Sequence, residues 1–176
     1  GVSPALGAET ARATLEAARA AVALGIKVSF DGNFRPKLWE RWGGDAQTIL
    51  RDLFDCAHIV FADYRDIGVV LGGQFPQAEA QARVDAAAAM AFAAFPRLQY
   101  MACTQRSAHS AGHNSLGAML LGRDGTRAIA PQEELTGIVD RIGGGDAFAA
   151  GVLHGLIEGF DAEATIRFEL AADCLK

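Results

Sequence analysis

Segments with helical periodicity alternate with short runs of β-branched and aromatic residues along most of this chain, and this alternation limits the fold more than any other feature. It predicts helices over residues 8–24, 45–56 and 78–95, a short helix up to residue 71, and strands over 26–31, 58–61 and 99–104. A helix that leads into a short apolar strand is half of a βαβ unit, in which the strands run parallel and are buried. We therefore expect an α/β fold built on a parallel sheet.

The pattern changes after residue 104. Residues 115–122 and 127–130 are apolar runs on either side of the tetrapeptide RDGT, so they predict an antiparallel hairpin with Asp124-Gly125 in its turn. A helix is expected to begin near Gly145, and a last helix is expected over residues 161–175. Because the chain has no Pro- or Ser-rich linker and no internal repeat, we expect a single domain over residues 1–176.

Composition excludes several classes of protein. The 176 residues are 51% hydrophobic, which suffices for a substantial core. The formal net charge is −5 and the basic residues are scattered singly, so the sequence does not favour nucleic acid as a partner. No apolar run approaches the roughly 20 residues of a membrane span, and no signal segment opens the chain. We therefore expect a cytoplasmic protein that does not bind membranes.

The cysteines and histidines point to no metal or disulfide framework. Cys56, Cys103 and Cys174 have no CxxC spacing, so we expect them as core thiols. His109 and His113 are spaced i, i+4, but the segment HSAGH fits a loop or a strand end better than a metal site.

Three consecutive glycines precede an acid at the start of the helix expected near residue 145. The amides of Gly143, Gly144 and Gly145 can point at a guest, and the helix dipole favours a phosphate or a developing oxyanion there. Asp146 would place a carboxylate beside this anion site, where it can accept a proton from an attacking hydroxyl. The motif lacks the GK[ST] of a Walker A loop and the GxGxxG pattern. A tight turn with a helix-capping acid is the alternative interpretation.

Polar side chains also follow the first expected strand, in the segment DGNFRPKLW. Asp31, Asn33 and Arg35 alternate there, so an extended backbone would place them on one side, and Pro36 would end regular structure. Ligands of open α/β sheets collect outside the carboxyl ends of the strands, and Arg35 could bind a carboxylate or phosphate. A solvated loop with an internal Asp–Arg pair explains the same pattern.

Two further strand ends carry polar residues. Asp63 and Asp66 are three apart on a short helix, a spacing that suits water-mediated Mg²⁺ near phosphates, or else a helix cap with a surface charge. The segment from Thr104 to Arg106 ends another strand and indicates little by itself.

Together these motifs resemble the ribokinase-like sugar kinases (the phosphofructokinase-B family), and within that family the 2-keto-3-deoxygluconate kinases. Asp140 followed by Gly143-Gly144-Gly145-Asp146 and AFAAG is similar to the family's GAGD-type loop. Asp31, Asn33 and Arg35, with Leu38-Trp39 after them, are similar to the strand end that faces the acid sugar in the ketodeoxygluconate branch.

The resemblance implies a three-layer α/β sandwich with a mainly parallel sheet and an antiparallel edge. It implies that Asp146 is the catalytic base for the sugar hydroxyl, while the amides of residues 143–145 form the anion hole. Arg35 would bind the substrate carboxylate, with Asp31 and Asn33 shaping the pocket. The reaction implied is ATP-dependent phosphorylation of the terminal hydroxyl of 2-keto-3-deoxygluconate.

The resemblance also implies positions for the cofactors. Asp63 and Asp66 stand where the family has an NxxE pair associated with Mg²⁺ and phosphate, with Asp in place of both. Thr104 and Arg106 match a strand end near the ATP nucleotide. Asp140 matches an acid that binds a monovalent cation in some members.

The chain departs from the family pattern in several places. Gly144 replaces the commoner alanine, and Arg141-Ile142 replace a Thr pair. The family's N-terminal part, with its Gly-Gly substrate element and small β-sheet lid, is not found, so we expect part of a longer kinase that forms homo-oligomers. A kinase of a neutral sugar such as fructose or ribose, and a nucleotide-binding fragment without catalysis, are the alternatives.

Overall fold

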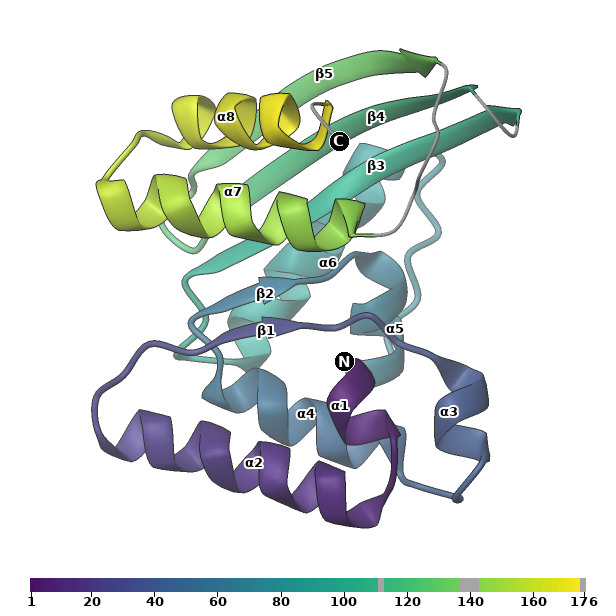
Figure 1. The fold of residues 1–176 in the computed structure, drawn as a ribbon, viewed down its shortest axis with the longest axis vertical. Helices are drawn as coiled ribbons and strands as arrows, with labels where there is room; N and C mark the ends of the chain where they lie inside the picture. The colour runs from purple at the N-terminus through teal and green to yellow at the C-terminus, as the bar shows by residue number, and fades with distance from the viewer. Residues whose placement is uncertain (111–112, 137–142, 175–176) are drawn as a thin grey trace. The chain divides into compact units, whose positions relative to one another are not determined.

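The computed structural model describes residues 1–110, 113–136 and 143–174, and the chain divides into two compact units, residues 1–101 and 102–176. Five strands follow one another in the sheet order β1-β2-β3-β4-β5 (Figure 1). The strand β3 (Tyr100–Ser110) begins in the first unit and continues in the second. The expected α/β class is confirmed, while the expectation of a single domain stays a prediction.

The first unit packs helices around two short parallel strands. Its elements are α1 (Val2–Ala5), α2 (Ala8–Ala23), β1 (Ser29–Asp31), α3 (Pro36–Glu40), α4 (Ala46–Cys56), β2 (Ile59–Phe61), α5 (Tyr64–Leu71) and α6 (Ala80–Ala94). Ser29 lies opposite Ile59 in the parallel register of β1 and β2. The largest fully buried side chains of the unit come from α4, α5, the segment after α6 and the start of β3: Leu50, Leu53, Phe54, Ile67, Phe95, Leu98 and Met101. The helices predicted over 45–56, up to 71 and over 78–95 are confirmed to within about two residues at each end.

The first expected strand is shorter and more exposed than predicted. The helix predicted over residues 8–24 is confirmed with Gly25 at its end, but Ile26 belongs to this helix end rather than to the strand. The Ile26 amide donates to the Ala21 carbonyl oxygen at 2.9 Å, and the Gly25 amide donates to that of Val22 at 3.0 Å. With Gly25 at φ 72°, this is a Schellman cap. The side chains of β1 are exposed or half-buried, because β1 stands at one end of the strand order and pairs only with β2 among the described strands. The prediction that this strand is buried was therefore wrong.

The second unit is an antiparallel hairpin with two helices. Its elements are the continuing β3, β4 (His113–Gly122), β5 (Arg127–Thr136), α7 (Gly144–Glu158) and α8 (Ala162–Cys174). The turn between β4 and β5 is closed by a bond from the Gly122 amide to the Thr126 carbonyl oxygen at 2.8 Å, with Gly125 at φ 93°. The predicted hairpin is confirmed, and it extends beyond the predicted ends with a bulge between Leu116 and Ala118. α7 and α8 lie side by side, and α8 packs against both strands (Figure 1).

Other expectations concern single residues. Cys56 and Cys103 are buried and form no disulfide among the described residues, as predicted, while the side chain of Cys174 lies outside the described residues. His109 is in β3 and His113 opens β4, so the pair lies at strand ends rather than on a helix. Among the described residues, no helix has the length and apolar character needed to cross a membrane.

Candidate functional site

The loop after β1 carries the first group of predicted site residues. The Gly32 amide donates to the Phe61 carbonyl oxygen at 2.8 Å, which continues the pairing of β1 with β2 by one residue. The Gly1 amino group donates to the Asp31 carbonyl oxygen. Arg35 precedes α3 and is exposed, and it forms no ion pair with any described residue. Asp31, Asn33 and Arg35 therefore lie together on one short segment at the carboxyl end of a strand.

The backbone of this loop differs from the prediction. Asn33 has φ 31°, in the left-handed region, so the stretch from Asp31 to Arg35 is not extended throughout and strict alternation does not hold. Asparagine is among the few residues other than glycine that adopt this conformation readily. Pro36 does not end regular structure. It opens α3 instead, where its missing amide hydrogen would have had no partner in the helix.

Asp63 and Asp66 form a capping box at the start of α5. Asp63 is the N-cap, and its carboxylate accepts from the Arg65 amide at 2.7 Å and pairs with the Arg65 guanidinium. Asp66 Oδ2 accepts in return from the Asp63 amide at 3.0 Å. The helix cap, which was one of the two interpretations of these residues, is thus present. The magnesium role of both residues stays a prediction.

The Asp66 carboxyl group also reaches the loop after β1. Its Oδ1 accepts from the Phe34 amide at 3.3 Å. Burial raises the pKa of Asp66, and the two backbone hydrogen bonds oppose that rise only in part. The Phe34 amide and Gly32, which lies against this carboxyl group, were not singled out in the sequence, since nothing local links them to a residue on α5.

The start of α7 holds the second group of predicted site residues. Gly143 is the N-cap with φ 82°, a conformation that favours glycine, and it provides no side chain to cap the helix. Its carbonyl oxygen accepts the first helical bond, from the Ala147 amide at 2.9 Å. The amides of residues 143–146 have no partner within the helix, and none of Gly144, Gly145 or Asp146 donates to another described group.

The space next to Gly145 is open among the described residues. A Cβ added at Gly145 would meet no atom within 4 Å. The Asp146 side chain is exposed and, among the described residues, has neither an ion pair nor a hydrogen-bond partner. An anion could therefore reach free amides next to an available carboxylate, whose catalytic role stays a prediction.

The remaining predicted residues are placed less completely. Thr104 is half-buried in β3. Arg106 follows in the same strand, with its side chain outside the described residues, and Asp140 lies outside them altogether. The structure thus groups residues 31–35 with Asp63 and Asp66 in the first unit, and places Thr104 and residues 143–146 in the second.

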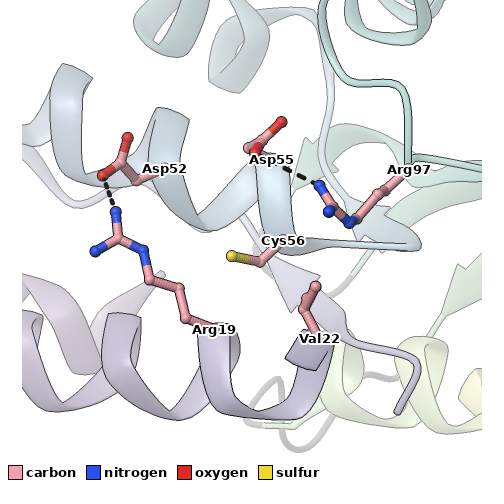
Figure 2. A pocket seen from close by; sticks show the side chains of 6 residues that line it. All are labelled: Arg19, Val22, Asp52, Asp55, Cys56 and Arg97. Atoms are coloured by element: carbon pink, nitrogen blue, oxygen red, sulfur yellow. Dashed lines mark hydrogen bonds and ion pairs between the residues drawn. The ribbon is translucent and has the colours of Figure 1, made fainter. Parts of the chain in front are cut away.

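A small hollow elsewhere in the first unit contains none of these residues. It measures about 180 Å³ and lies between α2, α4 and the segment before β3 (Figure 2). Cys56 lies between two ion pairs, Arg19–Asp52 at 2.9 Å and Arg97–Asp55 at 3.8 Å. Burial raises the pKa of the Cys56 thiol, so the thiol is a poor nucleophile. Ligand pockets usually span about 300–1,000 Å³, and the charges here are already paired. The hollow is therefore not a candidate site.

Known proteins match this chain over nearly its full length. The sequence model of the pfkB family of carbohydrate kinases matches residues 1–172. A curated relative, the 5-dehydro-2-deoxygluconokinase of Shouchella clausii (strain KSM-K16), is 27% identical over 167 residues, which cover 91% of this chain and 44% of that protein.

Solved structures agree with the sequence matches. A pfkB family carbohydrate kinase from Listeria grayi superposes with a TM-score of 0.86 at 27% identity, over 99% of this chain and 51% of that one. The 2-dehydro-3-deoxygluconokinase of Thermotoga maritima gives a TM-score of 0.84 at 30% identity, over 99% of this chain and 52% of that one. The expected ribokinase-like fold is confirmed by these similarities, and the chain spans about half the length of these relatives.

Proposed function

Because this chain belongs to the pfkB family of carbohydrate kinases, we propose that the full-length protein transfers the γ-phosphoryl group of ATP to a hydroxyl group of a sugar. The observation that carries the proposal is the start of α7, where the amides of residues 143–146 lack helical partners and the Asp146 carboxylate is exposed. Phosphoryl transfer depends mostly on positioning and charge stabilisation, and a helix N-terminus stabilises negative charge as it develops.

The residues of this chain would accept the proton of the sugar hydroxyl and stabilise the negative charge on the transferred phosphoryl group. The Asp146 carboxylate accepts the proton of the sugar hydroxyl as its oxygen attacks the γ-phosphorus and the bond to the ADP oxygen breaks. The amides of Gly143, Gly144 and Gly145 donate to the oxygens of the transferred group. Thr104 and Arg106 would lie near the nucleotide.

Magnesium is proposed as the cation that accompanies ATP, where it would offset the negative charge of the phosphate groups. Mg²⁺ usually keeps several waters and meets only one or two carboxylates. Asp63 and Asp66 are proposed for that role through water. Asp63 accepts three hydrogen bonds from Arg65 and Asp66 accepts two from backbone amides, fewer than the roughly four that a carboxylate can accept. No group of three or more acidic, histidine or cysteine side chains among the described residues could hold a metal alone. Asp140 is proposed for a monovalent cation.

The proposed substrate is 2-keto-3-deoxygluconate, phosphorylated at its terminal hydroxyl. Arg35 supports an acid sugar, since an exposed guanidinium without an ion pair among the described residues is available to a carboxylate. The Thermotoga relative, named for the same compound, supports this choice. The Shouchella relative supports a second candidate, 5-dehydro-2-deoxygluconate, which also carries one carboxylate. A neutral sugar such as fructose is the contrasting case.

The catalytic role is tested by Asp146→Asn in the full-length protein. General-base catalysis contributes about 10²–10⁴-fold, so kcat should fall by about 100-fold or more in a coupled ADP assay, with little change in melting temperature. Asp161→Asn is the matched control, because Asp161 caps the neighbouring helix through the Ala164 amide at 2.7 Å and asparagine caps equally well. Wild-type turnover in Asp146→Asn would remove Asp146 from the mechanism. ATP binding without ADP release in the wild type would favour a nucleotide-binding protein instead.

The substrate class is tested by Arg35→Ala. A lost hydrogen bond to a charged group is worth about 1.5–3 kcal/mol, so KM for the acid sugars should rise at least about tenfold while KM for fructose stays nearly unchanged. Arg41→Ala, at the exposed end of α3, is the control. Equal effects of Arg35→Ala on acid and neutral sugars would point to a neutral substrate.

A further inference from the structure

Asp66 joins two segments that lie far apart in the sequence. Its Oδ2 accepts from the Asp63 amide at the start of its own helix, α5. Its Oδ1 accepts from the Phe34 amide, 32 residues earlier, in the loop after β1. One carboxylate therefore holds the start of α5 and the loop that carries Asn33 and Arg35 in a fixed relation.

The loop after β1 also packs closely against the Asp66 carboxyl group, in addition to the hydrogen bond from Phe34. A Cβ added at Gly32 would lie 3.1 Å from Asp66 Cγ and 3.3 Å from its Oδ1, tighter than nine in ten real Cβ contacts. Asn33 lies between Gly32 and Phe34 in the chain, and its backbone has φ 31°. A residue other than glycine keeps a left-handed backbone only where its surroundings fix that conformation. The hydrogen bond from the next residue, through the Phe34 amide to Asp66, is one such constraint on Asn33.

The surroundings of Asp66 fit a structural anchor for the loop. Its carboxyl group is largely buried, and among the described residues it forms no ion pair with a basic side chain. Burial raises its pKa, and the backbone amides of Asp63 and Phe34 are what favour the ionised form.

We propose that Asp66 is a positioning residue for the sugar: through the Phe34 amide it fixes the loop of residues 31–35, and so places Asn33 and Arg35 for the substrate. This inference rests on the proposed function, because it requires that the loop binds a sugar acid. It assigns Asp66 a role toward the sugar in addition to any contact with the hydration shell of Mg²⁺.

The test uses the full-length enzyme with Asp66→Asn and Asp66→Ala. Asparagine has one carbonyl oxygen, so it keeps at most one good acceptor for the two amides, and alanine keeps none. KM for 2-keto-3-deoxygluconate should rise about tenfold or more in both variants, since one hydrogen bond to a charged group has at least that effect. KM for ATP and the Mg²⁺ concentration for half-maximal rate should change by a smaller factor than KM for the sugar, because one of the two lost hydrogen bonds holds the loop of residues 31–35 itself.

The matched control is Asp45→Ala. Asp45 also caps a helix, α4, through the Thr48 amide at 3.1 Å, but it is exposed. The hydrogen bonds that its side chain accepts among the described residues come from Thr48 and not from residues 31–35, so its loss should lower stability without changing KM for the sugar. Gly32→Ala disturbs the contact from the loop side and should raise KM for the sugar as well. That variant keeps the test decisive if Asp66→Ala does not fold.

Amide hydrogen exchange gives a readout independent of activity. Exchange at Phe34 should become at least about tenfold faster in the Asp66 variants and stay unchanged in Asp45→Ala. An unchanged KM for the sugar, or a shift confined to ATP and Mg²⁺, would overturn the positioning role. Absence of sugar-acid phosphorylation by the wild type would instead overturn the proposed function, whatever the exchange at Phe34.

Discussion

Gly155→Ala is expected to destabilise the packing of α7 against α8 even though alanine is the better helix former. A Cβ at residue 155 would lie 2.7 Å from Thr165 Oγ1, 2.8 Å from its Cγ2 and 3.0 Å from its Cβ. Rotation of the Thr165 side chain cannot relieve this contact, because its Cβ does not move when χ1 changes. The two helices would have to separate by several tenths of an ångström.

The magnitude follows from two opposing effects. Overpacking a closely packed contact costs about 1–3 kcal/mol, and replacing glycine by alanine inside a helix returns about 1 kcal/mol. The expected net loss in the free energy of unfolding is therefore about 1 kcal/mol. Thr165 is fully buried and its hydroxyl has no hydrogen-bond partner among the described residues, so Thr165→Ala removes two of the three close atoms together with an unsatisfied polar group.

The assay is urea denaturation of the intact protein in a double-mutant cycle. Gly155→Ala alone should lower the unfolding free energy, and Gly155→Ala/Thr165→Ala should recover most of the loss, with a coupling of at least about 0.5 kcal/mol. A stabilised Gly155→Ala variant, or additive effects of the two substitutions, would refute the reasoning.

Three other outcomes are expected. Asn33→Gly should keep the stability of the loop after β1, while Asn33→Val should lower the unfolding free energy by about 1–2 kcal/mol, since valine resists the left-handed φ of 31°; equal stabilities in urea would contradict this. Gly143→Ala should also lower the unfolding free energy by about 1–2 kcal/mol, because Gly143 has a left-handed φ of 82°. Because burial raises the pKa of Asp66 above 3.8, its carboxyl group contributes stability that is fully present below about pH 3.8 and is lost as the pH rises through the raised pKa. Asp66→Asn should therefore lose less stability than wild type over that rise, and parallel curves would contradict the assignment.

Helical periodicity was sufficient to predict the longer helices, and the Asp124-Gly125 turn was sufficient for the hairpin. α1 and α3 were missed because they span only four and five residues, too few to show a period. Ile26 was expected to begin a strand, yet it follows the glycine of a Schellman cap, a position where an apolar residue is common. A β-branched residue after a helix-ending glycine is therefore compatible with either structure.

Some residues of the candidate site could also be predicted from the sequence, and others could not. Asp31 and Asp63 could be placed at strand ends because the strands themselves were predictable. The hydrogen bond from the Phe34 amide to Asp66 joins residues 32 apart and depends on tertiary packing, so no local sequence pattern predicts it. The capping box does have a local pattern, an N-cap acid followed three residues later by a second acid.

Acids in the first turn of a helix illustrate why sequence position alone cannot assign a role. Glu9 in α2 pairs with Arg12 at 2.8 Å, and Glu163 in α8 pairs with Arg167 at 3.3 Å. Both pairs are exposed surface contacts of the kind that contributes little to stability. Each of these acids thus has a partner on its own helix, within one turn.

Asp66 and Asp146 also stand in first turns, and their surroundings differ from those two and from each other. Asp66 binds backbone amides and is largely buried, whereas Asp146 is exposed and has no partner among the described residues. A carboxylate in the first turn of a helix gains only the modest stabilisation of the helix dipole, about 0.3–1 kcal/mol, so its position beside free amides also suits a role toward a ligand. Asp146→Asn should consequently reduce kcat by about 100-fold or more, and Glu163→Gln should leave kcat unchanged. Equal turnover in these two variants would mean that Asp146 is one more surface acid.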